Sequence, residues 1–351
     1  MQNKFGLKDF ILMLLVSLAL VFSILAMRQD DRRWKQTESM TKKIGTIEQL
    51  VTRLDAKLES GISISGTNNA SNSNRPVNHD ESWIKEEGVP VQWFDTYTFA
   101  SDPRNEPDYA MGGTFKETFE AQPSKLTPVL GEDVYARRIG DQVCETLADY
   151  NPETLELEGA LAVAWQYDPE GEWIRVKIRD NARFSDGEPV TAEDVRWSYH
   201  DYINNPQLET ESLRSIMTKL DRIEVVSDKV VDIYFVEPDA YNLQMAMGFY
   251  ILPKHFYSTF TTTQINQSTA LTMGSGPFKF ESLNPEDQWT PGTDITLVRN
   301  EQYWGPKPAL ASMRFDVITE DVSLLTSFVN GETHMIRPSS PQFVDKSAQP
   351  G

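Results

Sequence analysis

Four carboxylates lie close together in the segment RFSDGEPVTAEDVRWSY. Asp186, Glu188, Glu193 and Asp194 fall within nine positions, and such a density of acids could serve a metal site or general acid–base catalysis. The same spacing also fits local structure. Asp-Gly marks a turn, Thr191 is a good N-cap with an acid three positions later, and a helix dipole favours negative charge in its first turn. We therefore interpret the cluster as a turn followed by a helix start.

Other residues with reactive side chains are scattered. The four histidines show no i, i+4 pairing, and the single cysteine, Cys144, can form no intrachain disulfide and has no zinc-type partner spacing. No nucleophile elbow, Walker loop or dinucleotide fingerprint is present. With 52 acids against 33 Lys and Arg, the net charge of -19 disfavours nucleic acid as a partner. We predict no catalytic residue, no metal and no cofactor; an enzyme whose residues are assembled from distant segments is the alternative.

The N-terminal end carries a long apolar run. After a flank at residues 1–9, residues 10–27 read FILMLLVSLALVFSILAM without a charge, long enough to cross a hydrocarbon layer of about 30 Å. We predict an uncleaved transmembrane signal anchor, and a cleaved signal peptide is the alternative. Basic residues flank both ends of the run, so the positive-inside rule does not set its orientation.

A short helix and a tether follow the apolar run. Residues 28–60 contain apolar side chains at spacings 4-3-4-3-4, which predicts a short coiled coil and homo-oligomers, or else a monomeric amphipathic helix. Residues 61–82 are rich in Gly, Ser and Asn, which is typical of a flexible linker. The members of the apolar seam are Met40, Ile44, Ile47, Val51, Leu54 and Leu58.

The remaining chain has a mixed pattern. Strict alternation predicts strands and 3.6-residue spacing predicts helices, and their interleaving indicates an α/β domain of mixed α+β character. Strands are expected at 112–119, 173–179, 278–282, 295–299 and 314–318, a hairpin at 221–236 that turns near 227–229, and helices at 133–150, from 191 onward and at 320–331.

Five motifs in a fixed order resemble one family. LAVAWQYDPEGEWIRVKIRDNARFSDGEPVTAEDVRWSYHDYINNP is followed by ILPKHFY, GSGPFKF, LVRNEQYWGPKPAL and FVNGETHM. Together they resemble the family 5 extracellular solute-binding proteins, the dipeptide/oligopeptide-binding type that serves ABC importers. The resemblance covers residues 112–335.

The resemblance implies a type II periplasmic-binding-protein-like fold in which two lobes enclose a ligand. It implies that residues 83–335 form the first lobe, from discontinuous subdomains, and that residues 336–351 start the crossover to a second lobe. We interpret the chain as truncated before most of that lobe; a natural one-lobed protein is the alternative.

The resemblance also implies where a ligand is contacted. The loop after the first strand and a glycine-containing turn would face the cleft between the lobes. LTP at residues 126–128 stands where the family has Leu-Asp-Pro, so one acid is missing. The expected ligand-binding residues are Glu120, Ala121, Gln122, Pro123, Ser124, Lys125, Gly274, Ser275 and Gly276.

The predicted function is a membrane-tethered solute-binding protein without enzymatic activity. It would capture peptides or similar small solutes for an ABC importer permease. Because the family works outside the cytoplasmic membrane, the single-pass anchor would place the globular part on the extracytoplasmic (periplasmic) side. An anchored sensor, or a structural or assembly protein with a degenerate lobe, is the alternative function.

Overall fold

The chain divides into two units, Met1–Asn78 and His79–Gly351, and the described residues belong to the second. The expected anchor at 10–27, the expected helix at 28–60 and most of the expected linker therefore lie outside the described residues. In the part that is described, no helix has the length and apolarity needed to cross a membrane. The computed structural model describes residues 79–94, 103–152 and 154–337.

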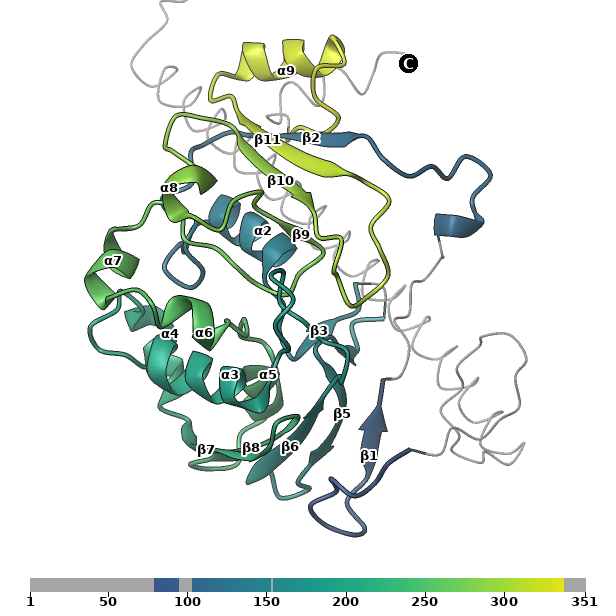
Figure 1. The fold of residues 1–351 in the computed structure, drawn as a ribbon, viewed down its shortest axis with the longest axis vertical. Helices are drawn as coiled ribbons and strands as arrows, with labels where there is room; N and C mark the ends of the chain where they lie inside the picture. The colour runs from purple at the N-terminus through teal and green to yellow at the C-terminus, as the bar shows by residue number, and fades with distance from the viewer. Residues whose placement is uncertain (1–78, 95–102, 153, 338–351) are drawn as a thin grey trace, which may run out of the picture. The chain divides into compact units, whose positions relative to one another are not determined.

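An antiparallel five-stranded sheet forms one layer, in the order β1-β5-β6-β8-β7 (Figure 1). The alternation expected from the sequence is confirmed in β6, where Ile174 and Val176 are fully buried. The expected hairpin is also confirmed, because β7 and β8 pair on either side of a short turn. The strands are β1 (Val91–Trp93), β5 (Ala162–Tyr167), β6 (Trp173–Ile178), β7 (Leu220–Ser227) and β8 (Val230–Phe235).

The polar face of this sheet is covered by residues 79–90, which we call the N-terminal strap and which lead into β1. Arg175 on β6 makes a two-pronged ion pair with Asp232 on β8, with N–O distances of 2.6 and 2.7 Å. Lys85 of the strap lies 3.4 Å from the same carboxylate and 4.1 Å from the centroid of the Trp173 ring. Arg175 also donates to the Trp83 carbonyl at 3.1 Å and Lys177 lies 3.6 Å from Asp80, so the basic side chains that alternate along β6 bind the strap.

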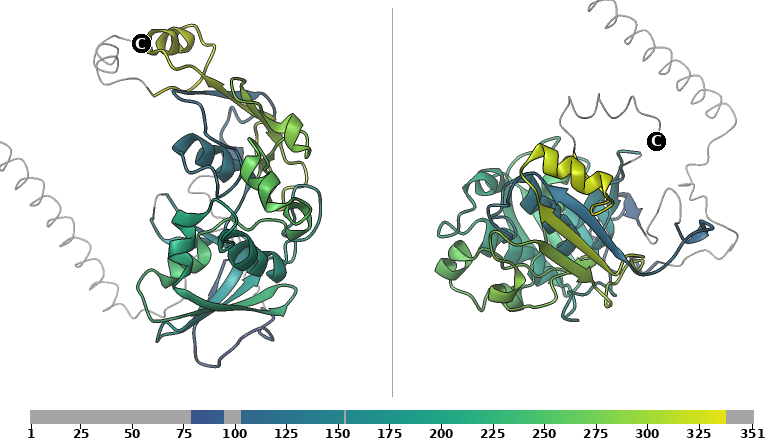
Figure 2. Two further views of the ribbon diagram at one scale, coloured as in Figure 1. Left: turned by 90° about the vertical axis from the view of Figure 1, so that its left-hand side faces the viewer. Right: turned by 90° about the horizontal axis from the view of Figure 1, so that it is seen from above.

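Short helices pack on the apolar face of the five-stranded sheet (Figures 1 and 2). The helix that starts after Thr191 is confirmed, and it continues into a wider turn of helix whose Tyr199 and Tyr202 are almost fully buried. These aromatic side chains fill the space between the helices and the sheet. The helices are α3 (Ala192–Trp197), η2 (Ser198–Ile203), α4 (Glu211–Met217), α5 (Asn242–Met247), α6 (Lys254–Tyr257) and α7 (Thr262–Gln267).

A four-stranded sheet forms the other layer, in the order β2-β11-β10-β9. Strands β2 and β11 are parallel, and α2 and α9 lie on opposite faces of this sheet (Figures 1 and 2). The strand expected at 295–299 is confirmed, whereas that at 278–282 is confirmed only over two residues. The elements are β2 (Thr114–Phe119), α2 (Val134–Val143), β9 (Phe278–Lys279), β10 (Ile295–Arg299), β11 (Ser312–Val317) and α9 (Asp321–Val329).

The helix expected at 133–150 was too long. Helix α2 ends at Val143, and Cys144 has the extended backbone of a strand. The Val143 carbonyl accepts the backbone N–H of Gly276 at 2.9 Å, and Ile251 N–H donates to Glu145 at 2.9 Å. Because these acceptors are taken by segments distant in the sequence, the chain leaves the helix and pairs as a strand.

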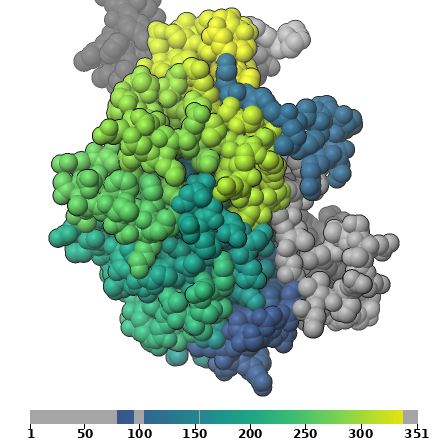
Figure 3. All heavy atoms as spheres, in the orientation of Figure 1, coloured from purple at the N-terminus to yellow at the C-terminus, as the bar shows by residue number. Residues whose placement is uncertain are grey.

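Smaller elements complete the fold. A two-stranded hairpin joins β3 to β4, and α9 stops as expected beside Gly331, whose φ of +72° suits glycine. The residues of α6 to α9 gather on the face seen in Figure 3, in green and yellow. The remaining elements are η1 (Pro103–Asn105), β3 (Ala148–Tyr150), β4 (Leu157–Gly159) and α8 (Pro285–Gln288).

Candidate functional site

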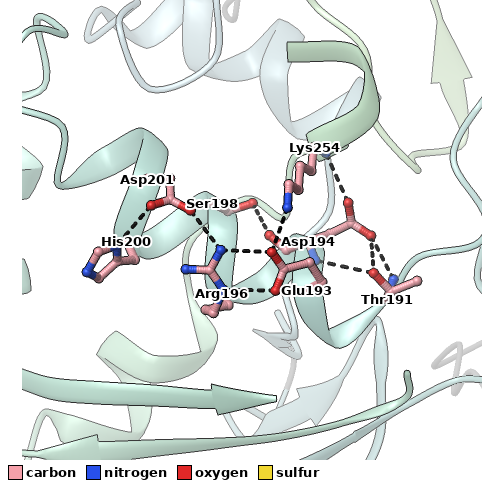
Figure 4. A network of polar contacts seen from close by, with 8 residues as sticks. All are labelled: Thr191, Glu193, Asp194, Arg196, Ser198, His200, Asp201 and Lys254. Atoms are coloured by element: carbon pink, nitrogen blue, oxygen red, sulfur yellow. Dashed lines mark hydrogen bonds and ion pairs between the residues drawn. The ribbon is translucent and has the colours of Figure 1, made fainter. Parts of the chain in front are cut away.

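The acidic cluster of residues 186–194 forms the start of α3. The Thr191 hydroxyl accepts the backbone N–H of Asp194 at 3.3 Å, and the Asp194 carboxylate accepts the backbone N–H of Thr191 at 2.9 Å (Figure 4). This is the reciprocal capping expected from the sequence. The second oxygen of Asp194 accepts the backbone N–H of Lys254 at 3.0 Å, so the cap also fixes α6.

Two of the other acids of the cluster, Glu193 and Asp186, are held by basic partners, whereas Glu188 is exposed. Glu193 is bound by Arg196 and by Lys254 at 2.8 and 2.7 Å (Figure 4). The hydrogen bond from Arg196 is the main reason that the pKa of Glu193 falls to about 2. Asp186 lies 2.7 Å from the Nε2 of His255 on α6. The cluster therefore joins α3 to α6 and has a structural role.

In the loop at 120–125, some side chains are exposed and others form hydrogen bonds with neighbouring segments. Glu120 and Gln122 are exposed. Ser124 donates its backbone N–H and its hydroxyl to Asp133, the N-cap of α2, at 2.8 and 2.7 Å. Lys125 donates to Glu209 at 2.6 Å. The second half of the loop is thus tied to α2 and to the segment before α4. Of the other two members of the loop, Ala121 is exposed and Pro123 is buried.

The turn at Gly274–Gly276 is buried under the end of α2. A Cβ on Gly276 would lie 2.6 Å from the Gln142 carbonyl oxygen, and a Cβ on Gly274 would overlap the Val143 carbonyl. Ser275 is fully buried. Glycine is needed here because two backbones approach closely.

The loop at 120–125 starts where several segments leave the four-stranded sheet. Strand β2 is parallel to β11, with Phe119 opposite Val317, and Glu117 on the other edge of β2 makes a parallel bridge with Met335. The C-terminal ends of these three segments therefore lie at one edge of the sheet, next to this loop.

A cavity of about 450 Å³ opens directly after the same loop. Its walls are the turn at 126–132, one face of α2, the β3–β4 hairpin, α4, and the segment that ends α5. This volume falls in the range of small-molecule sites, and both apolar and polar side chains line it. It is a candidate ligand site within the described part of the chain.

One wall of the cavity combines opposite charges with an aromatic ring. Arg137 and Asp141 lie four residues apart on α2, so both are on one face of that helix. The hydroxyl of Tyr250 donates to Asp141, and its ring passes Gly140 so closely that a Cβ there would lie 3.0 Å from the hydroxyl oxygen. Burial is the main cause that raises the pKa of Tyr250, and Asp141 adds to it. These groups can fix the polar ends of a small solute.

None of the nine residues expected to bind ligand lines this cavity. The wall begins at Leu126, one residue after the expected loop, and continues through α2 to Phe249 and Tyr250. The sequence held one usable signal, because Ala136 and Gly140 place two small residues on one face of a helix. Small residues at that spacing allow another segment to approach a helix closely.

A buried carboxylate links the chain just after α2 to the segment between β10 and β11. Glu145 accepts hydrogen bonds from the Tyr303 hydroxyl at 2.8 Å and from the Trp304 indole N–H at 2.7 Å. Burial raises the pKa of Glu145 to about 7, against the opposing effect of these donors. This network does not line the cavity, but it fixes the chain that follows α2.

Known proteins share this fold and part of this sequence. Residues 156–350 match the family described as bacterial extracellular solute-binding proteins, family 5 Middle. The probable peptide-binding protein YejA of Agrobacterium fabrum is 29% identical over 202 residues, which cover 55% of this chain and 31% of that protein. The nickel-binding periplasmic protein of Escherichia coli is 24% identical over 188 residues, which cover 50% of this chain and 32% of that protein.

A solved structure shows the same fold. The periplasmic binding protein DppA of Helicobacter pylori, in complex with the peptide STSA, superposes with a TM-score of 0.61 at 22% identity, covering 69% of this chain and 50% of that one. The part of this chain that matches the two curated relatives spans about a third of their length. Because the family match covers more than half of its residues, the chain belongs to the bacterial extracellular solute-binding proteins of family 5.

Proposed function

We propose that this chain is a membrane-tethered, extracytoplasmic solute-binding protein that captures peptides or similar small solutes for an ABC importer. The observation that carries the proposal is the cavity of about 450 Å³, which lies within a fold shared with periplasmic binding proteins. A dipeptide or tripeptide fits a volume of this size. Binding needs no catalysis, and Asp194 and Glu193 of the acidic cluster act in capping and in an ion pair.

The edge of the four-stranded sheet beside the loop at 120–125 supports closure by a second lobe. Strands β2 and β11 and the segment at 333–335 run toward the same edge, where the loop at 120–125 begins. Chain that continued from this edge would stand beside the cavity and the exposed Gln122. In this proposal the expected loop supplies ligand contacts from the rim, while the cavity receives the side of the ligand bound by the first lobe.

The polar groups of the cavity suggest how a solute is held. Arg137 can pair with a carboxylate, and Asp141 or Asp149 can pair with an ammonium group. One relative is named as a peptide-binding protein and another as a nickel-binding protein. We propose a peptide as the solute because the charged groups of the cavity suit its two ends and because the first relative is named for peptides. The anchor at 10–27 and the tether at 61–82 would hold the binding unit near a permease.

The test is ligand binding by the full chain in detergent solution. Native mass spectrometry of the protein purified without added ligand would reveal a bound solute. Isothermal titration would then use a panel of dipeptides, namely Gly-Gly, Ala-Ala, Val-Val, Leu-Leu, Phe-Phe, Lys-Lys and Glu-Glu, and separately nickel(II) with excess histidine. We expect saturable binding of at least one dipeptide.

A pair of variants on α4 links binding to the cavity. Ser212 lines the cavity and is exposed, so S212W should obstruct the cavity without unfolding the protein. Ser215 is exposed on the same helix but does not line the cavity, and S215W is the matched control. Binding should fall at least tenfold in S212W and stay unchanged in S215W. Equal affinities in both variants would mean that the ligand binds outside the cavity. If the protein bound nickel–histidine and no dipeptide, nickel–histidine and not a peptide would be the solute.

A further inference from the structure

Val129 lies in a backbone conformation that valine rarely adopts. Its φ is +75°, in the left-handed region, where a β-branched side chain is a clear outlier. Pro128 precedes it, and Leu130 N–H donates to the Thr127 carbonyl at 3.2 Å, as in a type II turn. Such a turn favours glycine at the position that Val129 occupies.

The surrounding structure holds this turn from both sides. Before it, Leu126 N–H donates to the Thr269 carbonyl at 2.7 Å. Within it, the buried Tyr202 hydroxyl donates to the Pro128 carbonyl at 3.4 Å. After it, Gly131 N–H donates to the Thr127 carbonyl at 3.0 Å. Strained residues persist where neighbouring contacts over-determine the backbone, and they gather at ligand sites.

Val129 also belongs to the wall of the cavity. It is half-buried and packs against the apolar core, while Leu126, Thr127, Pro128, Gly131 and Glu132 around it line the same wall. Glycine would remove the strain but would also remove the only bulk that this position gives to the wall. Valine at position 129 therefore strains the backbone, and its side chain gives the cavity wall a defined shape.

We propose that Val129 is a specificity-determining residue of the cavity, which limits the size of the apolar group that a bound solute can place against the turn at 126–132. The inference rests on the proposed function, because it concerns the selectivity of the same cavity. Removing methyl groups from an apolar pocket commonly changes discrimination between ligands by about tenfold or more per methylene difference.

Leu155 provides a matched control. It is the other non-glycine residue with a positive φ in the described chain, at +59°, and its side chain is 73% exposed. It lies in the turn of the β3–β4 hairpin and does not line the cavity. L155G therefore relieves backbone strain of the same kind without changing the wall.

The experiment compares V129A, V129G and L155G in the full chain with the dipeptide panel named above. We expect V129A and V129G to shift the ratio of affinities toward the bulkier apolar dipeptides by about tenfold or more, and L155G to keep the wild-type ratio. We also expect V129G to melt at a higher temperature than V129A, because glycine alone relieves the left-handed strain.

The outcomes separate this inference from the proposed function. If the wild-type chain binds no dipeptide, the proposed function fails and Val129 has no such role. If the wild-type chain binds dipeptides and both Val129 variants keep its order of affinities within twofold, only the inference on Val129 is overturned. A shift of the same size in L155G would also overturn it, since the effect would then come from backbone relaxation and not from the wall.

Discussion

The indole N–H of Trp304 donates to the buried carboxylate of Glu145 over 2.7 Å, and so ties the segment between β10 and β11 to the chain that leaves α2. The two residues are 159 positions apart in the sequence. Burial raises the pKa of the carboxyl from 4.5 to about 7, which makes its charge state sensitive to pH near neutrality.

Stability should therefore fall as the pH rises from about 4.5 to 7. In this window the unfolded chain loses the Glu145 proton while the folded chain keeps it, so the folded state binds more protons and loses stability with rising pH. E145Q should flatten that slope in urea unfolding measured at pH 5, 6, 7 and 8. A slope equal to that of the wild type would show that other groups govern stability in this pH window.

Glu193 acts in a separate pH window. Because its pKa is lowered, its contribution to the stability of the fold disappears only as the pH falls below 4.5.

Removing Asp232 should destabilise the fold strongly. Its side chain is 2% exposed and pairs with Arg175, while Lys85 lies 3.4 Å away. D232N leaves two cations without a full counter-charge, and breaking a buried pair in this way costs about 3–5 kcal/mol. Chemical denaturation measures the loss. The control is the double variant R175M/D232L, which removes both partners and should recover part of the stability. A loss below about 1 kcal/mol in D232N would mean that water solvates the pair.

Thr191 should contribute to the stability of the fold only by capping the N-terminus of α3. T191A removes the acceptor for the Asp194 N–H and should lower the free energy of unfolding by about 1 kcal/mol. T191S keeps the hydroxyl and should remain close to the wild type. The midpoint of urea unfolding distinguishes the two variants, and an equal loss in both would point to the Thr191 methyl group instead.

Gly276 should tolerate no side chain. A Cβ there would meet backbone atoms of Gln142 and Val143, which cannot move without disturbing the end of α2. G276A should therefore lose about 1–3 kcal/mol, as is usual when atoms are added to a tightly packed place. Gly292 has open space but a φ of +91°, so G292A reports the backbone effect of alanine alone. Thermal unfolding of the pair should rank G276A as the less stable.

Local features could be predicted from the sequence. The capping box at Thr191, the alternation of β6 and the stop of α9 at Gly331 all depend on residues within a few positions, and all three are confirmed. Each is decided by hydrogen bonds or side-chain spacing within one element. The family resemblance extended these local patterns to the fold, because its motifs occur in a fixed order.

The cavity could not be predicted in the same way. Its walls bring together Ala136 of α2, Leu213 of α4 and Phe249 from the segment after α5, and no local pattern encodes that meeting. The predicted end of α2 was wrong for a similar reason. Helical spacing of apolar residues continues to Leu147, but the Val143 carbonyl accepts a hydrogen bond from the backbone N–H of Gly276, which is distant in the sequence. The expected contacts at 120–125 and 274–276 stay predictions, one group at the rim of the sheet and the other buried below α2.

The position of the N-terminal strap has a mechanical consequence. Residues 79–90 lie on the polar face of the five-stranded sheet, while α4 and α5, two of the helices that line the cavity, pack on its apolar face. Tension arriving through residue 79 would first load Lys85, its Asp232 partner and the β1–β5 ladder. For a protein tethered through residues 1–78, as proposed, the sheet would stand between that load and helices α4 and α5, so tension would act on the strap before it acts on the cavity.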